Sequence, residues 1–224
     1  MKYKLPIPFA LIFWIIVGAD VLGIATDISW LHLIAKPLLI PVLMLLLVFT
    51  STTAPRKYLL LAGLFFSWLG DLFLLFEDKN ALFFIFGLVC FLTTHVFYIL
   101  YFLKIQSSAV SLLKKQPVLI VLVIGYGITL VWFLFPHLND LKIPVMIYAA
   151  VICTMLLCSL HVFFKVNRPA NMLYLAGAIL FVLSDSLLAI NKFYQPFAFA
   201  GVLIMLTYCA AQYGIANGFI KQSS

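Results

Sequence analysis

The chain has 224 residues, of which 66% are hydrophobic and 9% are charged, and it carries a formal net charge of +7. Soluble domains are about a quarter charged, so this composition, with a mean hydropathy of +1.19, excludes a water-soluble fold and predicts an integral membrane protein. The positive charge does not indicate nucleic-acid binding, because the basic residues stand at the edges of apolar runs and act there as topology signals.

Eight apolar runs bounded by charged residues, Pro or Asn predict the transmembrane helices. We expect an all-α polytopic bundle of about eight helices, without strands, because the runs are apolar on all sides. The first run follows Lys2 and Lys4 but is too long for a signal peptide and lacks a cleavage site, so an uncleaved helix is expected. In chain order the predicted helices lie near residues 5–25, 30–50, 57–77, 80–103, 117–136, 143–165, 170–191 and 196–220.

Basic residues are divided unevenly between the two sides of this bundle. The termini and the connections after the second, fourth and sixth helices hold ten of the fourteen Lys and Arg residues. The positive-inside rule therefore predicts a multi-pass protein with both termini in the cytoplasm. In a bacterial cell the protein is expected in the inner membrane, and in a eukaryotic cell in the endoplasmic reticulum.

An internal repeat relates the two halves of the chain. Residues 61–101 align without gaps on 175–215, and this alignment pairs Asp71 with Asp185 and Gly87 with Gly201. Because an even number of helices separates the copies, both run in the same direction across the membrane. The sequence therefore predicts one transmembrane domain, 1–224, with repeat halves of approximately 1–110 and 115–224, although the first two helices of each half match poorly.

The two aligned aspartates are the first candidates for function. An ionised carboxylate at bilayer depth costs roughly 2.5 to 3.5 kcal/mol on insertion scales, so such residues are kept where they are used. Asp71 and Asp185 lie about 14 residues into their helices, which places each about 20 Å from the cytoplasmic end. Asp20 and Glu77 lie near helix ends, so we expect them to be solvated at the membrane interface.

Further polar residues are expected near the aspartates. The second predicted helix enters the membrane from the outer side and carries Lys36 at a depth similar to that of the aspartates. Lys36 is therefore the natural counter-ion for one aspartate, and its neighbour Pro37 can kink the helix. An inert buried salt bridge is the alternative interpretation. Helical spacing places Ser67 and Asp71 on one face of the third predicted helix, and Asp185 and Lys192 on one face of the seventh. The residues predicted to bind substrate are Lys36, Ser67, His95, Tyr98, Ser184, Asn191, Lys192, Tyr208 and Gln212.

Polar residues near the middle of the membrane permit two interpretations. His95, Tyr98, Tyr208 and Gln212 either line a pocket or hold helices together by hydrogen bonds. The remaining histidines lie at helix ends or alone and are expected to be ordinary packed residues. No cofactor and no metal is expected, since no cluster has ligand spacing and no phosphate loop or nucleophile elbow is present. The residues outside any expected site include His32, His137, His161 and the four cysteines, Cys90, Cys153, Cys158 and Cys209.

Short motifs along the whole chain occur in the order found in a known membrane-protein family. They are Ala35-Lys36-Pro37-Leu38, Ser67-x-x-Gly70-Asp71-x-x-Leu74, His95-x-x-Tyr98, Ser184-Asp185-Ser186-x-x-Ala189 with Lys192-Phe193, and Tyr208-x-x-x-Gln212. The chain resembles the YhhN/TMEM86 family, whose animal members are lysoplasmalogenases. The resemblance implies hydrolysis of the vinyl-ether bond of lysoplasmalogens to a fatty aldehyde and glycerophosphoethanolamine or glycerophosphocholine, with a lysophospholipid substrate and membrane lipids as partners.

Two carboxyl groups in unlike surroundings suit this reaction. Vinyl-ether hydrolysis needs an acid that protonates the alkene and an anion beside the oxocarbenium ion, as glycoside hydrolysis does. We expect one aspartate to be the acid and the one closer to Lys36 to stay ionised and orient water, while Lys36 or Lys192 meets the phosphate. The headgroup is expected at the outer side, with the alkenyl chain running toward His95 and Gln212.

Two other classes of protein fit parts of this pattern. A membrane transporter or lipid-binding protein would use the buried aspartates as ion or proton sites without changing a covalent bond. A purely structural scaffold fits poorly, because a scaffold gains little from so many buried polar groups.

Overall fold

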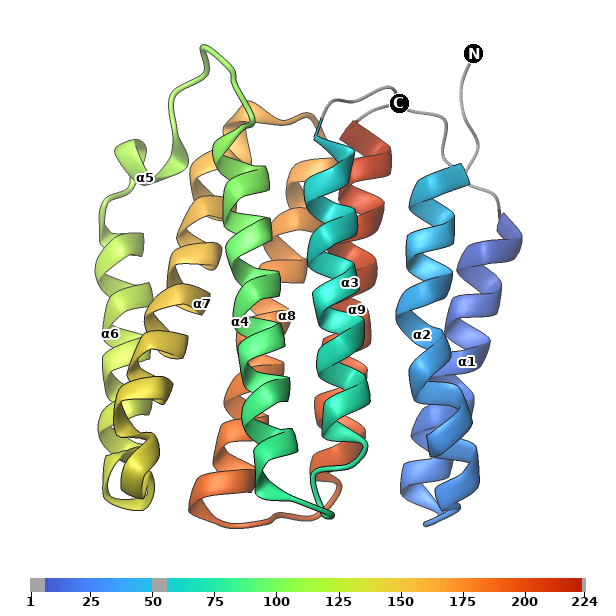
Figure 1. Cartoon of the computed structure of the whole chain (residues 1–224). Coiled ribbons are helices and arrows are strands. Elements are labelled where there is room, and N and C mark those ends of the chain that lie inside the picture. Colours follow the sequence, from blue (N-terminus) through green and yellow to red (C-terminus); the bar gives the residue numbers. More distant parts are fainter. Residues whose placement is uncertain (1–6, 50–55, 223–224) are drawn as a thin grey trace.

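The computed structural model describes residues 7–49 and 56–222, and within these ranges every regular element is a helix (Figure 1). Eight long helices alternate in direction, which confirms the predicted all-α polytopic bundle. Seven of them are long and apolar enough to cross a membrane, and α1 contains a shorter apolar stretch, Phe9–Ala25. The long helices are α1 (Ile7–Ala25), α2 (Ser29–Phe49), α3 (Lys57–Leu74), α4 (Ala81–Leu103), α6 (Val118–Leu134), α7 (Lys142–Val162), α8 (Ala170–Ala189) and α9 (Ala200–Gln222).

Short helical segments join or extend these long helices. The four-residue helix α5 (Leu112–Lys115) precedes α6, and the sequence analysis did not predict it. Directly after α8, residues Ile190–Tyr194 form a short π-helix that continues it. Single 3-10 turns cover Phe135–His137, Asn139–Leu141 and Phe163–Lys165.

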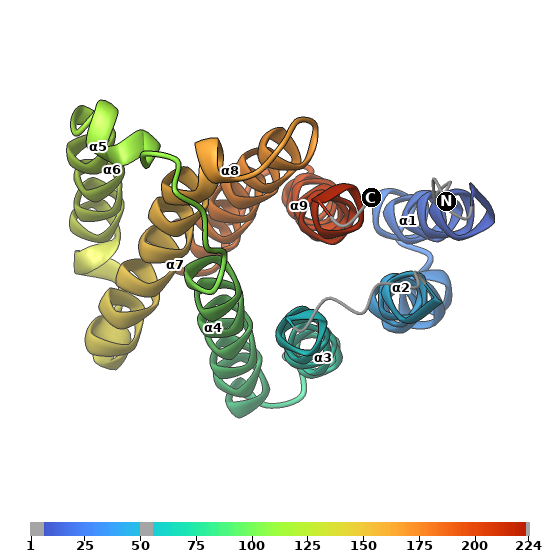
Figure 2. The same cartoon turned by 90° about the horizontal axis from the view of Figure 1, so that it is seen from above.

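Seven of the long helices form a closed ring, and α6 lies outside it (Figure 2). Around the ring the order of contacts is α1, α2, α3, α4, α7, α8 and α9, with α9 returning to α1. The hairpins α3–α4 and α8–α9 are the most closely packed pairs. Helix α6 packs mainly on α7, and only Gly127 and Leu134 of its residues are buried. The ring therefore surrounds an interior that α6 does not reach directly.

Proline in α2 produces a specific bond to α3. Because Pro41 has no N–H, the carbonyl of Pro37 loses its usual partner within the helix. The indole Nε1 of Trp68 on α3 donates to this carbonyl at 2.9 Å. A freed backbone acceptor inside a membrane needs such a partner, so the proline fixes how α2 and α3 meet.

The hairpin α8–α9 is tightly packed because glycines face each other in it. A Cβ atom on Gly214 would lie 3.2 Å from the Cα of Gly177, and one on Gly177 would lie 2.9 Å from the carbonyl oxygen of Ala211. Small residues let membrane helices approach closely, since lipid gives no hydrophobic drive for their association. This close approach sets the position of Asp185 on α8.

The two ends of the molecule carry opposite charge. All seven acidic residues lie in the half away from the start of α1 and the end of α9, whereas most basic residues lie at the end where those two helix ends meet (Figure 1). The basic residues at that end are Arg56, Lys57, Lys104, Lys114, Lys115, Lys165, Arg168 and Lys221. Lys2 and Lys4 lie outside the described residues, and the cytoplasmic placement of this end stays a prediction.

The aligned stretches of the proposed repeat fall in the two tight hairpins. Residues 61–101 belong to α3–α4 and residues 175–215 to α8–α9. The aligned residues Tyr98 and Gln212 hydrogen-bond to each other across the interior, at 2.6 Å. The pairs α1–α2 and α6–α7 differ, since α1 contacts α9 within the ring and α6 stands outside. The division into repeat halves remains a prediction.

Candidate functional site

A cavity of about 570 Å³ lies inside the ring, and both Asp71 and Asp185 line it. Its walls come from α1, α2, α3, α4, α8 and α9. Exposed Asp27 and Asp78, in the connections α1–α2 and α3–α4, stand at its mouth, at the end away from the basic residues. The two aspartates that the internal repeat aligns thus line the same cavity.

Asp71 lies one turn before the end of α3 and is 2% exposed. Its Oδ2 accepts a hydrogen bond from the Tyr208 hydroxyl at 2.6 Å. Because the hydroxyl hydrogen of Tyr208 is used in the bond to Asp71, the Tyr208 oxygen accepts a hydrogen bond from the Ser67 hydroxyl, at 2.7 Å. Gln212 donates to Ser67 at 2.6 Å, and Tyr98 donates to Gln212 at 2.6 Å. These four buried side chains form a chain of donors that ends on the Asp71 carboxyl group.

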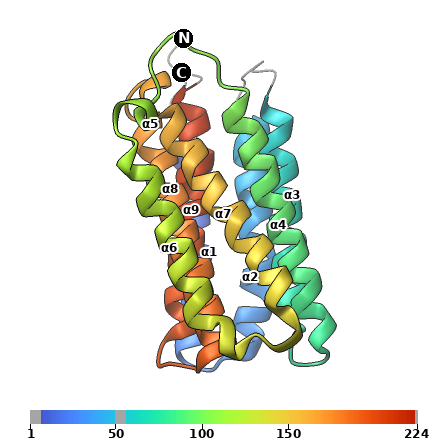
Figure 3. The ribbon, with the colours of Figure 1, turned by 90° about the vertical axis from the view of Figure 1, so that its left-hand side faces the viewer.

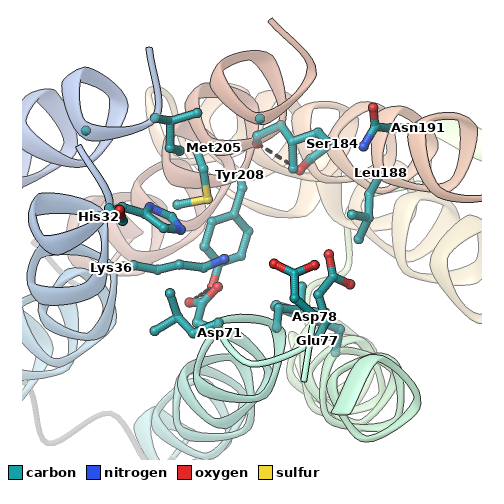
Figure 4. Close-up of a pocket in the computed structure, with 18 of the residues that line it drawn as sticks. His32, Lys36, Asp71, Glu77, Asp78, Ser184, Leu188, Asn191, Met205 and Tyr208 are labelled. Atoms are coloured by element: carbon teal, nitrogen blue, oxygen red, sulfur yellow. Dashed lines mark hydrogen bonds between the residues drawn. The ribbon is translucent and has the colours of Figure 1, made fainter. Parts of the chain in front are cut away.

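Lys36 supplies the positive charge of the site. It is 7% exposed, and Figure 4 shows its ammonium group directed into the cavity toward Asp71 and Tyr208. It interacts electrostatically with Asp71, yet among the described residues no carboxylate lies within ion-pair distance of it. The predicted neighbourhood of Lys36 and one aspartate is thus present, but the inert salt bridge that was the alternative is not formed.

Asp185 has different partners. Its Oδ2 accepts from the Tyr148 hydroxyl at 2.6 Å and lies 3.0 Å from Nε2 of His95. The side chain of Asp185 is 12% exposed, whereas that of His95 is fully buried. Nδ1 of His95 has no hydrogen-bond partner among the described residues, so Nε2, between a carboxyl and a phenol, is the nitrogen that takes part in the network.

Each aspartate is held by a helix of the other tight hairpin. Asp71 on α3 is bonded to Tyr208 on α9, and Asp185 on α8 is bonded to His95 on α4. Tyr148 on α7 adds the second bond to Asp185. This crossed arrangement means that the position of either carboxyl group depends on the packing of both hairpins.

The predicted substrate-binding residues divide into three groups. Four of them line the cavity, four are buried behind it, and one lies beside its mouth. Lys192, the last of these, pairs with Glu77 at 3.0 Å and lies over the ring of Phe84 at 4.7 Å, outside the cavity lining. The cavity residues are Lys36, Ser184, Asn191 and Tyr208, and the buried ones are Ser67, His95, Tyr98 and Gln212.

The predicted path for an alkenyl chain, toward His95 and Gln212, is closed. Ser67, His95, Tyr98 and Gln212 each have an exposed fraction of 0%, and none of them lines the cavity. They act as the interhelical hydrogen bonds that the second interpretation predicted. The expected chain route is therefore wrong, because packed side chains fill the space that it needed.

The sequence analysis also misplaced or missed residues of the site. Asp20 was expected at the interface but is fully buried, and it accepts from His32 at 2.8 Å. His32 and Glu77 line the cavity, whereas we expected neither of them at the site. Tyr148 was missed altogether, since a single tyrosine in an apolar helix gives no signal. Asp20 and His32 meet because α1 and α2 form an antiparallel hairpin. The short connection between the two predicted helices is the signal that could have indicated this contact.

Among the described residues no group of three or more His, Cys, Asp or Glu side chains is placed to hold a metal ion. The four cysteines are free thiols, three of them buried. The polar side chains that line the cavity carry carboxyl, phenol, imidazole, ammonium, hydroxyl and amide groups.

Eight long apolar helices and an interior cavity that two carboxyl groups share define a polytopic α-helical membrane protein with a buried dicarboxylate site. The chain belongs to the YhhN family, whose sequence model matches residues 31–219. Lysoplasmalogenase TMEM86A of Bos taurus is 31% identical over 176 residues, which cover 75% of this chain and 68% of the bovine protein. Lysoplasmalogenase TMEM86B of Sus scrofa is 32% identical over 191 residues, covering 82% and 73%.

A bacterial relative also matches. A lysoplasmalogenase of Mycobacterium bovis is 31% identical over 142 residues, which cover 61% of this chain and about half, 51%, of the mycobacterial protein. No solved structure gives a significant match.

Proposed function

We propose that this chain is a lysoplasmalogenase, a membrane hydrolase that converts a lysoplasmalogen and water to a fatty aldehyde and a glycerophospho-alcohol. The observation that carries the proposal is that Asp71 and Asp185 line one cavity and differ in their partners. The names of the bovine, porcine and mycobacterial relatives support it. The transport alternative is not favoured, because those relatives are named for a hydrolytic activity.

The reaction needs one proton donor and one water molecule. Protonation of the alkene carbon next to the ether-bearing carbon gives an oxocarbenium ion. Water adds to the ether-bearing carbon and returns a proton to a carboxylate, and the resulting hemiacetal breaks its bond to the glycerol oxygen to release the aldehyde. Two carboxyl groups in different surroundings can divide the roles of acid and anion, as they do in glycoside hydrolysis.

Asp185 is the acid in this scheme. Asp185 is partly exposed whereas Asp71 is buried, so protons from the cavity can reach Asp185 after each turnover. Nε2 of His95 lies 3.0 Å from Oδ2 of Asp185 and can hydrogen-bond to it. A proton donor that must be reloaded in every cycle needs this kind of access.

Asp71 is the anion that stabilises the oxocarbenium ion and orients water. The Tyr208 hydroxyl, the last in the chain of donors, bonds to it, and the ammonium group of Lys36 is directed toward it (Figure 4). Hydrogen-bond donors and a nearby cation stabilise a carboxylate, and fixed charges in a site sheltered from water act strongly on a developing positive charge.

Lys36 also takes the substrate phosphate. Its ammonium group is directed into the cavity and has no ion-pair partner among the described residues. A cation that remains unpaired at membrane depth is costly, so an anionic ligand group is its natural complement. We place the glycerophospho headgroup between Lys36 and the mouth, on the side of the membrane away from the cytoplasm.

Aldehyde release by purified protein tests the proposal. Asp71→Asn and Asp185→Asn should each lower the rate at least about 100-fold, the usual scale of acid–base catalysis. Asp140→Asn is the matched control, because Asp140 is exposed at the same end but does not line the cavity. Lysolipids with a vinyl-ether, an ester or a saturated-ether bond should be compared, and only the first should be cleaved. Near wild-type rates in either cavity variant contradict the assignment of that residue.

A further inference from the structure

Asp185 borders small cavities on the side of it that faces away from the central cavity. One, of about 50 Å³, lies among α6, α7 and α8, and the other, of about 40 Å³, among α4, α7 and α8. Tyr148 lines both of them, and the second also shares Leu188 with the central cavity. The carboxyl group of Asp185 therefore stands where the polar central cavity meets apolar space that leads outward.

The outermost of these spaces is a groove lined by α6 and α7, which lie side by side and face the viewer in Figure 3. Its volume is about 610 Å³, and its lining is almost wholly apolar. Gly127, Val131, Ala149 and Cys153 line both this groove and the 50 Å³ cavity. The wall between the groove and Asp185 is thus a single layer, which includes a glycine, an alanine and a cysteine.

Helix α6 is the weakly held part of that wall. Only Gly127 and Leu134 of its residues are buried, and the hydroxyl of Tyr126 donates to Ser186 of α8 at 2.7 Å. This bond is partly buried, but few other side chains of α6 are buried, and loosely packed elements open most readily. A chain that leaves the central cavity crosses the ring between α7 and α8, where Tyr148 bonds to Asp185, and then passes between α6 and α8, where Tyr126 bonds to Ser186.

The groove also has the right position along the membrane normal. It begins near Phe135 and Met146, at the end where the central cavity opens, and extends to Ile124 and Leu157, nearer the middle of the molecule. A lysolipid with its headgroup at the cavity mouth points its chain in this same direction. The buried route past His95 and Gln212 is filled, whereas one layer of residues separates this groove from the small cavity beside Asp185.

We propose that the alkenyl chain of the lysolipid leaves the central cavity past Asp185 and Tyr148 and lies in the groove between α6 and α7. This inference rests on the proposed function for the identity of the chain. The vinyl-ether bond then lies beside Asp185, the headgroup lies toward Lys36, and substrate and aldehyde exchange with the bilayer across α6.

Groove-filling variants test the path through kinetics. Ala150→Trp places an indole ring in the groove from an exposed position, and Ala149→Phe adds a ring to the wall that the groove shares with the 50 Å³ cavity. For a substrate with an octadecenyl chain, both variants should lower kcat/KM about ten-fold to a hundred-fold, as misplacement of a reacting group does. For a substrate with a butenyl chain, which is too short to reach the groove, kcat/KM should not change. Ile147→Trp is the control, because Ile147 is 51% exposed on the same helix and lines neither space. Equal losses for both chain lengths, or no loss in either variant, overturn the path.

A binding experiment separates this inference from the proposed function. A saturated-ether lysophospholipid with a diazirine at the end of its chain cannot be cleaved, and it reports chain position whether or not the protein is a hydrolase. Labelling should concentrate on peptides 118–135 and 142–162, should fall in Ala150→Trp but not in Ile147→Trp, and should be displaced by unlabelled lysolipid more than by a fatty alcohol. Labels spread evenly over the lipid-facing helices, or gathered on α1 and α9, overturn the path. Absence of vinyl-ether cleavage by the wild type, with the groove labelled as described, overturns the proposed function alone.

Discussion

Lys36 combines burial, positive charge and the absence of an ion-pair partner among the described residues. Inside a bilayer such a charge is expensive unless a ligand or another protein group meets it. Its place in the cavity lining, directed toward Asp71, gives it two roles in the proposed reaction, one toward the phosphate and one toward the carboxylate (Figure 4).

Replacing Lys36 should therefore affect substrate binding first. Lys36→Met should raise KM for a lysoplasmalogen about ten-fold or more, because a hydrogen bond to a charged group contributes roughly 1.5 to 3 kcal/mol. Lys36→Arg keeps the charge and should retain much of the wild-type KM. Steady-state kinetics in lipid nanodiscs measure both variants. An unchanged KM in Lys36→Met contradicts the phosphate assignment.

Tyr208 is the last donor in the buried chain that reaches Asp71. Tyr208→Phe removes that bond and leaves the Ser67 hydroxyl without its acceptor. The loss of one buried partner costs about 1 to 3 kcal/mol, so kcat should fall about ten-fold or more, while KM changes little. Tyr194→Phe, at an exposed tyrosine away from Asp71, serves as the control. A larger effect on KM than on kcat would assign Tyr208 to substrate binding instead.

Sequence alone singled out the two aspartates and Lys36 as candidates, because a charge within an apolar run is rare and costly, and the structure places all three in the cavity lining. The sequence could not identify Tyr148 or the burial of Asp20. A tyrosine is common in membrane helices, and its role appears only when α7 places its hydroxyl 2.6 Å from Asp185. Burial of Asp20 depends on His32, whose distance from it is set by the α1–α2 hairpin and not by local sequence.

At the scale of single helices, the bond from Trp68 to the Pro37 carbonyl depends on Pro41. Trp68→Phe should lower the free energy of unfolding by about 1 to 2 kcal/mol, since it leaves a carbonyl unpaired. In a Pro41→Ala background the helix can supply its own N–H to that carbonyl, so the same Trp68→Phe change should cost less. Denaturation of the four proteins in detergent gives this coupling energy. Equal costs in both backgrounds would show that the carbonyl does not need Trp68.

The helices themselves were predictable, whereas their arrangement was not. A run of about 20 apolar residues has one stable conformation in a bilayer, and for this reason the observed helices lie close to the predicted ranges. Lipid is as apolar as a helix surface, so the sequence of α6 does not reveal that it stands outside the ring. The filled space around Gln212 was equally hidden, because a polar residue in mid-membrane suits a cavity and a hydrogen-bonded contact alike.

At the scale of the whole molecule, the cavity opens at the acidic end and the basic residues lie at the other. The positive-inside rule predicts that the basic end lies in the cytoplasm. On this prediction the cavity mouth, with Asp27 and Asp78, faces the opposite side of the membrane, and the α6–α7 groove begins on that side. The route of the substrate thus follows from the orientation of the entire bundle.

Single cysteines at the two ends test this orientation. Asp140→Cys lies at the acidic end and Ser107→Cys in the connection between α4 and α5, and both positions are exposed. In intact cells or sealed right-side-out vesicles, a thiol reagent that cannot cross membranes should label Asp140→Cys at once and Ser107→Cys only after permeabilisation. Of the native cysteines, Cys153, Cys158 and Cys209 are buried and Cys90 is partly buried, so the wild type gives the background for both. The reverse order of labelling would place the cavity mouth in the cytoplasm. The substrate would then bind from the inner leaflet, because its headgroup lies at the mouth in either orientation of the protein.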